Sequence, residues 1–289
     1  MKNMKILGII VMIAIIGFTM TACDGDDGVT TTTASLGDEL KLTNQQVYTE
    51  VWNANGSTSL TPFNGNLTIK AISGYEDSNW NYHEFDLGGT GSVTAGKLNF
   101  TLGTPPSDSL SVLFGEDEDE GLIITVSDPE VKGVFFYEFS ADNGYLYRSK
   151  SSYSETQTSS SGSYEMVEYV YVEKDVNVSA KKYTDTYNEE EDGITYKGTW
   201  TQNAFSINLK KGWNALCYKY TATSSFNAAT NTSTSTSSTS YSASIPSGLN
   251  WIYDDDDYND LSINYSILPS GETAPRSSFK PPRSIFGKK

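Results

Sequence analysis

The residues that most often carry catalysis are scarce in this chain. Its 289 residues include one histidine, His83, and two cysteines, Cys23 and Cys217, and 36 acidic residues outnumber 20 lysines and arginines. A histidine-dependent triad therefore has a single candidate base, and a zinc site with two histidine ligands is excluded. The net charge of −16 argues against nucleic acid as a partner, because its phosphates would be repelled.

Sequence motifs of known enzyme classes are missing as well. The chain has no G-x-S-x-G nucleophile elbow and no G-x-x-x-x-G-K phosphate loop. The run from His83 to Leu87 alternates like a strand, which favours a structural or surface histidine. Carboxylates are plentiful, so a glycoside hydrolase using two acids remains an alternative, although no spacing selects a pair. We predict no catalytic residue, no cofactor and no metal ligand.

The N-terminus has the three-part order of a secretory signal. Met1 to Lys5 carries two lysines, Ile6 to Phe18 is almost wholly apolar, and Thr19 to Ala22 contains smaller residues before Cys23. At about 1.5 Å per helical residue, this apolar stretch is shorter than a hydrocarbon core of about 30 Å. A permanent transmembrane helix is therefore the poorer interpretation.

Residues Met20-Thr21-Ala22-Cys23 resemble the lipobox of bacterial lipoproteins. The resemblance implies cleavage after residue 22 and attachment of a diacylglyceryl group to the Cys23 thiol, and two acyl chains are about what stable anchoring needs. Cleavage would remove two lysines and leave 18 basic against 36 acidic residues. Such a chain would not dock on anionic lipid by charge, so the covalent anchor is the predicted attachment.

With Cys23 acylated, Cys217 has no disulfide partner in the chain. It lies in an alternating run, Leu216 to Tyr220, which indicates a small buried thiol on a strand rather than a nucleophile. Residues 23–39 are rich in aspartate, glycine and threonine and are predicted to be a flexible tether.

The rest of the chain is predicted to be all-β, an antiparallel β-sandwich over residues 40–268 with long Ser/Thr-rich loops or hairpins. Alternating or strand-length apolar runs indicate the strands; they cover 66–73, 97–102, 122–126, 134–139, 164–173, 193–200, 204–209, 215–221 and 261–268. Asn-Gly and Asp-Gly pairs indicate tight turns between them. One short helix is expected over 108–114, and a domain split near residue 155 is the alternative to a single sandwich.

Two Ser/Thr tracts, Ser149–Ser163 and Thr221–Ser244, contain too few large apolar residues to form core. We expect long loops or protruding hairpins there. The last segment, 269–289, is rich in proline and basic residues and is predicted to be a disordered tail, either inert or in contact with anionic headgroups. Leu209 to Asn214 resembles a turn found in uncharacterised β-sandwich lipoproteins of spirochaetes and Bacteroidetes, which implies a fold type but no activity.

Two further features leave alternatives open. The acidic clusters at 116–120, 189–192 and 254–257 are either solvated loops or sites for a hard cation such as calcium, although none has the spacing of a known calcium loop. The alternating pairs Trp80 with Tyr82 and Tyr169 with Tyr171 are either core or an exposed aromatic binding strip.

The sequence thus favours a lipoprotein held on the extracytoplasmic side of a bacterial membrane through Cys23, at the cell surface or the periplasmic face. Its predicted role is non-catalytic: it binds a protein or glycan partner or has a structural role in the cell envelope. Nucleic acid is not a predicted partner. The first alternative is an envelope polysaccharide hydrolase using paired carboxylates, and the second is a subunit of a larger assembly.

Overall fold

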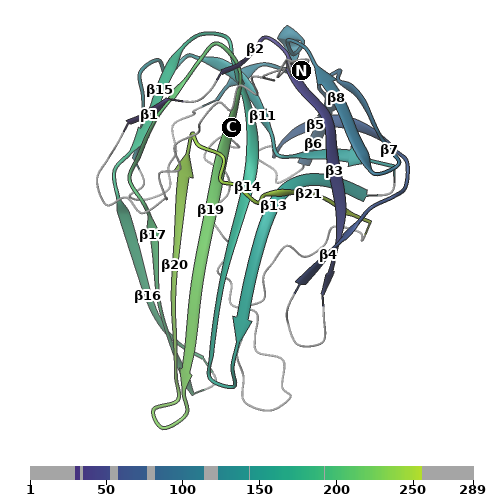
Figure 1. Ribbon diagram of the computed structural model, residues 1–289. Helices are drawn as coiled ribbons and strands as arrows, with labels where there is room; N and C mark the ends of the chain where they lie inside the picture. The colour runs from purple at the N-terminus through teal and green to yellow at the C-terminus, as the bar shows by residue number, and fades with distance from the viewer. Residues whose placement is uncertain are drawn as a thin grey trace, which may run out of the picture.

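The computed structural model describes residues 30–32, 35–52, 58–76, 82–113, 123–142, 144–191 and 193–255. Almost all of them lie in strands (Figure 1), and the helical content of these ranges is one 3₁₀ turn, η1 (Ser107–Ser109). The all-β prediction is confirmed. The short helix expected over 108–114 is wrong, because η1 ends at Ser109 and strand β9 (Ser111–Val112) follows it.

Seven strands close into a barrel. In pairing order they are β13 (Gly144–Glu155), β12 (Glu138–Ala141), β5 (Leu67–Glu76), β7 (Thr90–Thr94), β8 (Lys97–Leu102), β3 (Leu40–Trp52) and β21 (Asn250–Asp254), which returns to β13. Strands β4 (Thr58–Pro62) and β6 (Tyr82–Asp86) pair with β3 and β5. The sandwich predicted for this part of the chain is wrong, because these strands close into a barrel. Inward-facing and outward-facing residues alternate along the strands of a sandwich and of a barrel alike, so the alternation could not distinguish the two.

A bulge in β3 helps the barrel to close. The pairing of β3 with β8 shifts register between Leu42 and Gln45, and Asn44 lies in this interval with a positive φ of 54°. Extra residues in one strand bend it and increase its twist. The last pairing, between β3 and β21, is parallel and places Trp251 opposite Val47.

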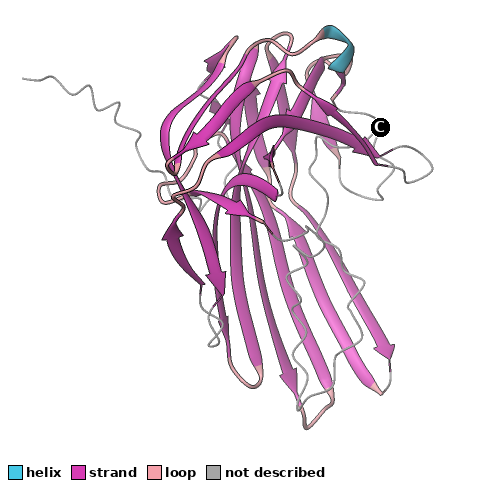
Figure 2. Cartoon of the chain, turned by 90° about the vertical axis from the view of Figure 1, so that its right-hand side faces the viewer, coloured by secondary structure: helices cyan, strands magenta, loops and turns pink. Residues whose placement is uncertain are grey.

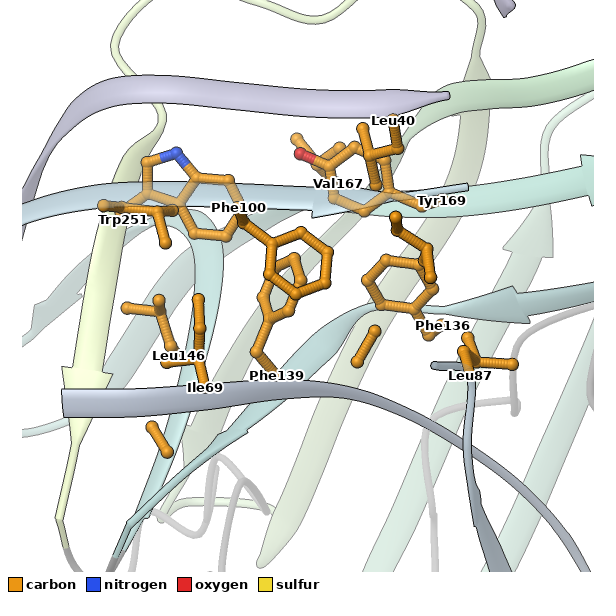
Figure 3. Close-up of a cluster of buried hydrophobic side chains, with 14 of the residues drawn as sticks. Leu40, Ile69, Leu87, Phe100, Phe136, Phe139, Leu146, Val167, Tyr169 and Trp251 are labelled. Atoms are coloured by element: carbon orange, nitrogen blue, oxygen red, sulfur yellow. The ribbon is translucent and has the colours of Figure 1, made fainter. Parts of the chain in front are cut away.

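The barrel encloses an aromatic core (Figure 3). Phe139 is fully buried at its centre, with ring centroids 4.6 Å from Phe100, 5.2 Å from Phe136 and 5.5 Å from Trp251. Trp213 extends this cluster, and its indole Nε1 donates a hydrogen bond to the carbonyl of Gly103 at 2.9 Å. The indole N–H of Trp213 is therefore satisfied, whereas Nε1 of Trp251 in the same core is buried with no hydrogen-bond partner among the described residues.

From the barrel, β13 continues into a long sheet whose strands run side by side toward one end of the molecule (Figures 1 and 2). Its order is β13, β14 (Ser159–Val172), β19 (Gly212–Asn227), β20 (Thr232–Ser242), β17 (Ile194–Gln202) and β16 (Tyr183–Glu191). The two Ser/Thr tracts form the β13–β14 and β19–β20 hairpins of this sheet, which confirms protruding hairpins over loops.

A smaller sheet forms a second layer on the long one. It contains β1 (Thr30–Thr32), β18 (Phe205–Leu209), β15 (Val176–Ala180) and β10 (Ile124–Val126). Alternate residues of β15 and β18, such as Val178 and Ile207, are buried against Val170, Leu216 and other residues of β14 and β19. Strands β11 (Lys132–Phe136), β9 and β2 (Ser35–Gly37) complete the pairing at the barrel end of β14 and β19.

Several predicted boundaries can be placed on this fold. Within the expected tether 23–39, residues 30–32 and 35–37 form β1 and β2. Residue 155, the alternative domain boundary, ends β13 and pairs with Ser160 of β14 in one continuous sheet. The signal segment 1–22, the strand expected at 261–268 and the tail 269–289 lie outside the described residues.

The turn from Leu209 to Asn214 joins the two layers. The Asn214 side chain accepts a hydrogen bond from the Lys210 backbone and donates to the carbonyl oxygens of Lys210 and Gly212. Asp175 accepts from the Lys211 backbone at 2.8 Å and from Lys210 Nζ at 2.9 Å. The side chains of Asn214 and Asp175 therefore stabilise this turn, which leads into β19.

Candidate binding surface

Of the predicted lipid site and the rare reactive residues, the structure describes His83 and Cys217. Cys23 lies outside the described residues. His83 is in β6, opposite Tyr75 of β5. Cys217 is 1% exposed in β19 and its Sγ lies 3.7 Å from the carbonyl oxygen of Tyr218, so the expected buried structural thiol is confirmed.

The acidic clusters are described only in part, and their described members are not grouped as metal ligands. Glu189 to Glu191 are exposed at the end of β16, Asp254 ends β21, and the cluster at 116–120 lies outside the described residues. Across the described ranges, no group of three or more histidine, cysteine, aspartate or glutamate side chains is placed to hold an ion.

The aromatic pair Tyr169 and Tyr171 belongs to the core. They are 2% and 5% exposed, and Tyr169 stacks on Phe136 with ring centroids 5.2 Å apart. Burial raises the pKa of Tyr169 to about 12, and the positive charge of Arg148 and a hydrogen bond with it oppose the rise. The alternative of an exposed strip is therefore wrong for this pair; Trp80 of the other pair lies outside the described residues, and Tyr82 is in β6.

The long sheet carries a feature that the sequence tracts only partly show: two complete rows of hydroxyl side chains. Directly opposed residues of neighbouring strands point to the same side of a sheet. The outer row, farther from the barrel, is Ser154, Ser161, Thr223, Thr236, Thr199 and Thr186, in strand order from β13 to β16. The inner row is Ser152, Ser163, Thr221, Ser238, Thr201 and Thr184. We call these 12 residues the hydroxyl face.

The hydroxyl face is open to solvent. In the outer row every side chain except half-buried Thr199 is exposed, and the inner row is exposed or half-buried. Strand spacing of about 4.8 Å makes each row about 24 Å long, and two residues along a strand separate the rows by about 7 Å. The face thus consists of two parallel rows of neutral hydrogen-bonding groups.

A charged row separates the hydroxyl face from the barrel core. Lys150, Glu165 and Lys219 pair across β13, β14 and β19, and Lys219 Nζ lies 3.5 Å from Glu165 Oε1. The next residue on this side of β14, Val167, is fully buried. One side of the same strand therefore passes from hydroxyl to charge to apolar core.

The two rows differ in their internal hydrogen bonds. Inner-row hydroxyls pair at 2.8 Å between Ser152 and Ser163 and at 2.8 Å between Thr221 and Ser238. Thr184 and Thr201 pair at 3.2 Å. In the outer row, no side-chain hydrogen bond links its hydroxyls to other described residues. Each outer hydroxyl therefore offers a donor and two acceptor lone pairs to a partner or to water.

The opposite side of the long sheet is packed with aromatic rings. Tyr220 is 8% exposed, Tyr183 meets Trp200 with centroids 6.0 Å apart, and the Tyr187 hydroxyl lies 2.7 Å from Ser235 Oγ. The ring of Tyr187 lies against Gly198, where a Cβ atom would come within 1.9 Å of it. The aromatic residues thus stabilise the sheet from behind and leave the hydroxyl face without rings.

A half-buried glutamate, Glu138, lies on the barrel wall. Glu138 alternates with core residue Phe139 in β12, and its Oε2 atom is buried with no hydrogen-bond partner among the described residues. Burial raises the pKa of Glu138 to about 7 from an ordinary 4.5, and the charge of exposed Glu84 adds to the rise.

Comparisons with known proteins add no relative. No family model, curated protein or solved structure matches the chain. In the described residues, no helix is long and apolar enough to cross a membrane.

Proposed function

We propose that this chain is a bacterial lipoprotein, held by lipid on Cys23 at the extracytoplasmic side of a membrane, which binds an envelope partner through its hydroxyl face without catalysis. The observation that carries the binding role is the register of the long sheet, which brings 12 hydroxyl side chains from six strands onto one exposed side. The lipobox-like Met20 to Cys23 supports the anchor.

A surface of this kind fits binding better than structural packing. Most polar groups that serve the fold find partners inside it, whereas the outer-row hydroxyls project into solvent. Twelve neutral hydroxyls supply hydrogen bonds but no nucleophile-activating base and no charge for transition-state stabilisation. The face therefore supports recognition of an extended partner.

The anchor is tested by cysteine substitution. Cys23→Ala should abolish labelling by radioactive palmitate and move the protein from the membrane to the soluble fraction. Cys217→Ala is the matched control, because that thiol is buried in β19 and should leave labelling intact. Unchanged membrane partition of Cys23→Ala would contradict lipid attachment at Cys23.

The binding role is tested on the hydroxyl face. The triple variant Thr199→Val, Thr223→Val, Thr236→Val removes three adjacent outer-row hydroxyls while keeping side-chain shape. It should reduce capture of the protein by solubilised cell envelope. Capture equal to that of the unchanged protein would exclude the hydroxyl face as the binding surface.

A second candidate, an envelope polysaccharide hydrolase, is favoured by one observation. Glu138 has a pKa of about 7 and is influenced by the charge of Glu84, as a general acid beside a second carboxylate would be. Glu138→Gln should then abolish release of reducing sugar from envelope polysaccharide. Absence of such release by the unchanged protein excludes this candidate.

A further inference from the structure

We infer that the outer row of the hydroxyl face binds a neutral, linear polysaccharide laid across the six strands; this ligand class rests on the proposed function above. The row places Ser154, Ser161, Thr223, Thr236, Thr199 and Thr186 in one line.

The net charge of the chain and the charges around the outer row favour an uncharged partner. The chain carries a net charge of −16, so an anionic polymer would be repelled at long range. The outer row itself bears no charge. On the same side of the sheet, exposed Lys197 lies two residues beyond Thr199 in β17, and the charged row of Lys150, Glu165 and Lys219 lies on the far side of the inner row. A cationic partner would find its counter-charges at Glu189 to Glu191, at the end of β16, and not along the row.

Hydrogen-bonding geometry selects a polymer with repeated hydroxyls. The row repeats at about 4.8 Å, the spacing of neighbouring strands, over a length of about 24 Å. Each of its hydroxyls both donates and accepts, which matches sugar hydroxyls of either role. A peptide strand would instead seek backbone groups at a sheet edge, and the central strands β14, β19, β20 and β17 of this sheet are paired on both sides.

The hydrogen bonds within the inner row leave the outer row available to a ligand. The hydroxyls of its three pairs, including Thr221 with Ser238, bond to one another, whereas the outer-row hydroxyls have no side-chain partner in the part of the chain that the structure describes. A polysaccharide chain resting on the outer row can then accept and donate at each strand. Many weak, identical contacts of this kind gain strength from their number.

The experiment uses the full-length mature protein extracted in detergent and sedimented with insoluble cellulose, chitin or, as an anionic polymer, cross-linked polygalacturonate. The row variant is Thr199→Val, Thr223→Val, Thr236→Val. The control variant is Thr90→Val, Thr101→Val, Thr125→Val, which removes three hydroxyls from β7, β8 and β10 at exposed or half-buried positions.

The expected result is binding to at least one neutral polysaccharide and none to polygalacturonate. A net hydrogen bond corresponds to roughly a two- to tenfold change in an equilibrium constant, so the row variant should bind about tenfold more weakly or worse, and the control variant unchanged. No binding to either neutral polymer, or equal losses in both variants, would overturn the ligand class.

A second arm separates this inference from the proposed function. Solubilised envelope is offered before and after digestion with protease. If the row variant loses capture of a protease-sensitive partner while no polysaccharide binds, the ligand is a protein and the inference is wrong, although the hydroxyl face still binds. If the row variant loses nothing in either arm, both proposals are wrong.

Discussion

The aromatic core at the barrel and the hydroxyl face share strands β14 and β19 but are stabilised by different means. β14 carries Tyr169, 2% exposed, in the barrel core and Ser161, exposed, on the hydroxyl face, and β19 likewise carries Trp213 and Thr223. The backbone pairing of these two strands runs without interruption from Ser159 opposite Ser225 to Val172 opposite Gly212. The ladder is therefore common to both regions, and side-chain burial separates them.

This difference in burial assigns the two regions different roles. Burial of apolar surface contributes about 25 cal/mol per Å², whereas an exposed hydroxyl gives up little water on folding. The buried apolar clusters, one at the barrel and one between the long sheet and the smaller sheet, thus supply most of the favourable free energy of folding. The hydroxyl face can be changed at small cost to stability, which makes it a surface on which binding can be altered independently.

The largest expected effect is in the barrel. Phe139→Ala removes a fully buried ring that contacts Phe100, Phe136 and Trp251 and should lower the free energy of unfolding by about 3–5 kcal/mol. The measurement is urea unfolding followed by tryptophan fluorescence. Thr223→Val, an exposed change on β19, is the comparison and should stay within about 0.5 kcal/mol. Similar losses in both variants would contradict the division between the regions.

Local patterns predicted the individual strands well. The alternation of Leu98, Phe100 and Leu102 predicted a strand over 97–102, and β8 has these bounds. The barrel could not be predicted, because its closure depends on β3 and β21, which lie about 200 residues apart in the chain. Nothing in either strand alone signals that Val47 will lie opposite Trp251.

The hydroxyl face was predictable in part. The Ser/Thr tracts indicated two hairpins, and both exist. The rows also need Thr199 and Thr201 from β17, which pairs with β20 in parallel, and Thr184 and Thr186 from β16. These residues lie outside the two tracts, and a one-residue slip in any pairing would turn them to the other side of the sheet.

The next effect is a pH dependence confined to the barrel. The folded-state pKa of Glu138 is raised to about 7 from 4.5, so the folded state holds this proton more tightly than the unfolded chain. The associated stability is present below pH 4.5 and is lost as pH rises through about 7, by on the order of 3 kcal/mol.

Glu138→Gln keeps a neutral side chain at every pH. Above pH 7 it should therefore unfold at a higher urea concentration than the unchanged protein, and the two should converge near pH 4.5. Glu190→Gln makes the same charge change at an exposed position of β16 and serves as control. A parallel pH profile for Glu138→Gln and the unchanged protein would show that the Glu138 carboxyl does not carry this dependence.

The smallest effect distinguishes the two rows of the hydroxyl face. Thr221→Val removes an inner-row hydroxyl bonded to Ser238 at 2.8 Å, whereas Thr223→Val removes an outer-row hydroxyl of the same strand that has no such bond. The loss in unfolding free energy should be about 0.5–1 kcal/mol for Thr221→Val and near zero for Thr223→Val.

The double variant Thr221→Val, Ser238→Ala removes both partners and should recover part of the loss, because no hydroxyl then lacks its partner. Equal stabilities of Thr221→Val and Thr223→Val would mean that inner-row pairing adds nothing to the fold, and the rows would then differ only in their distance from the barrel.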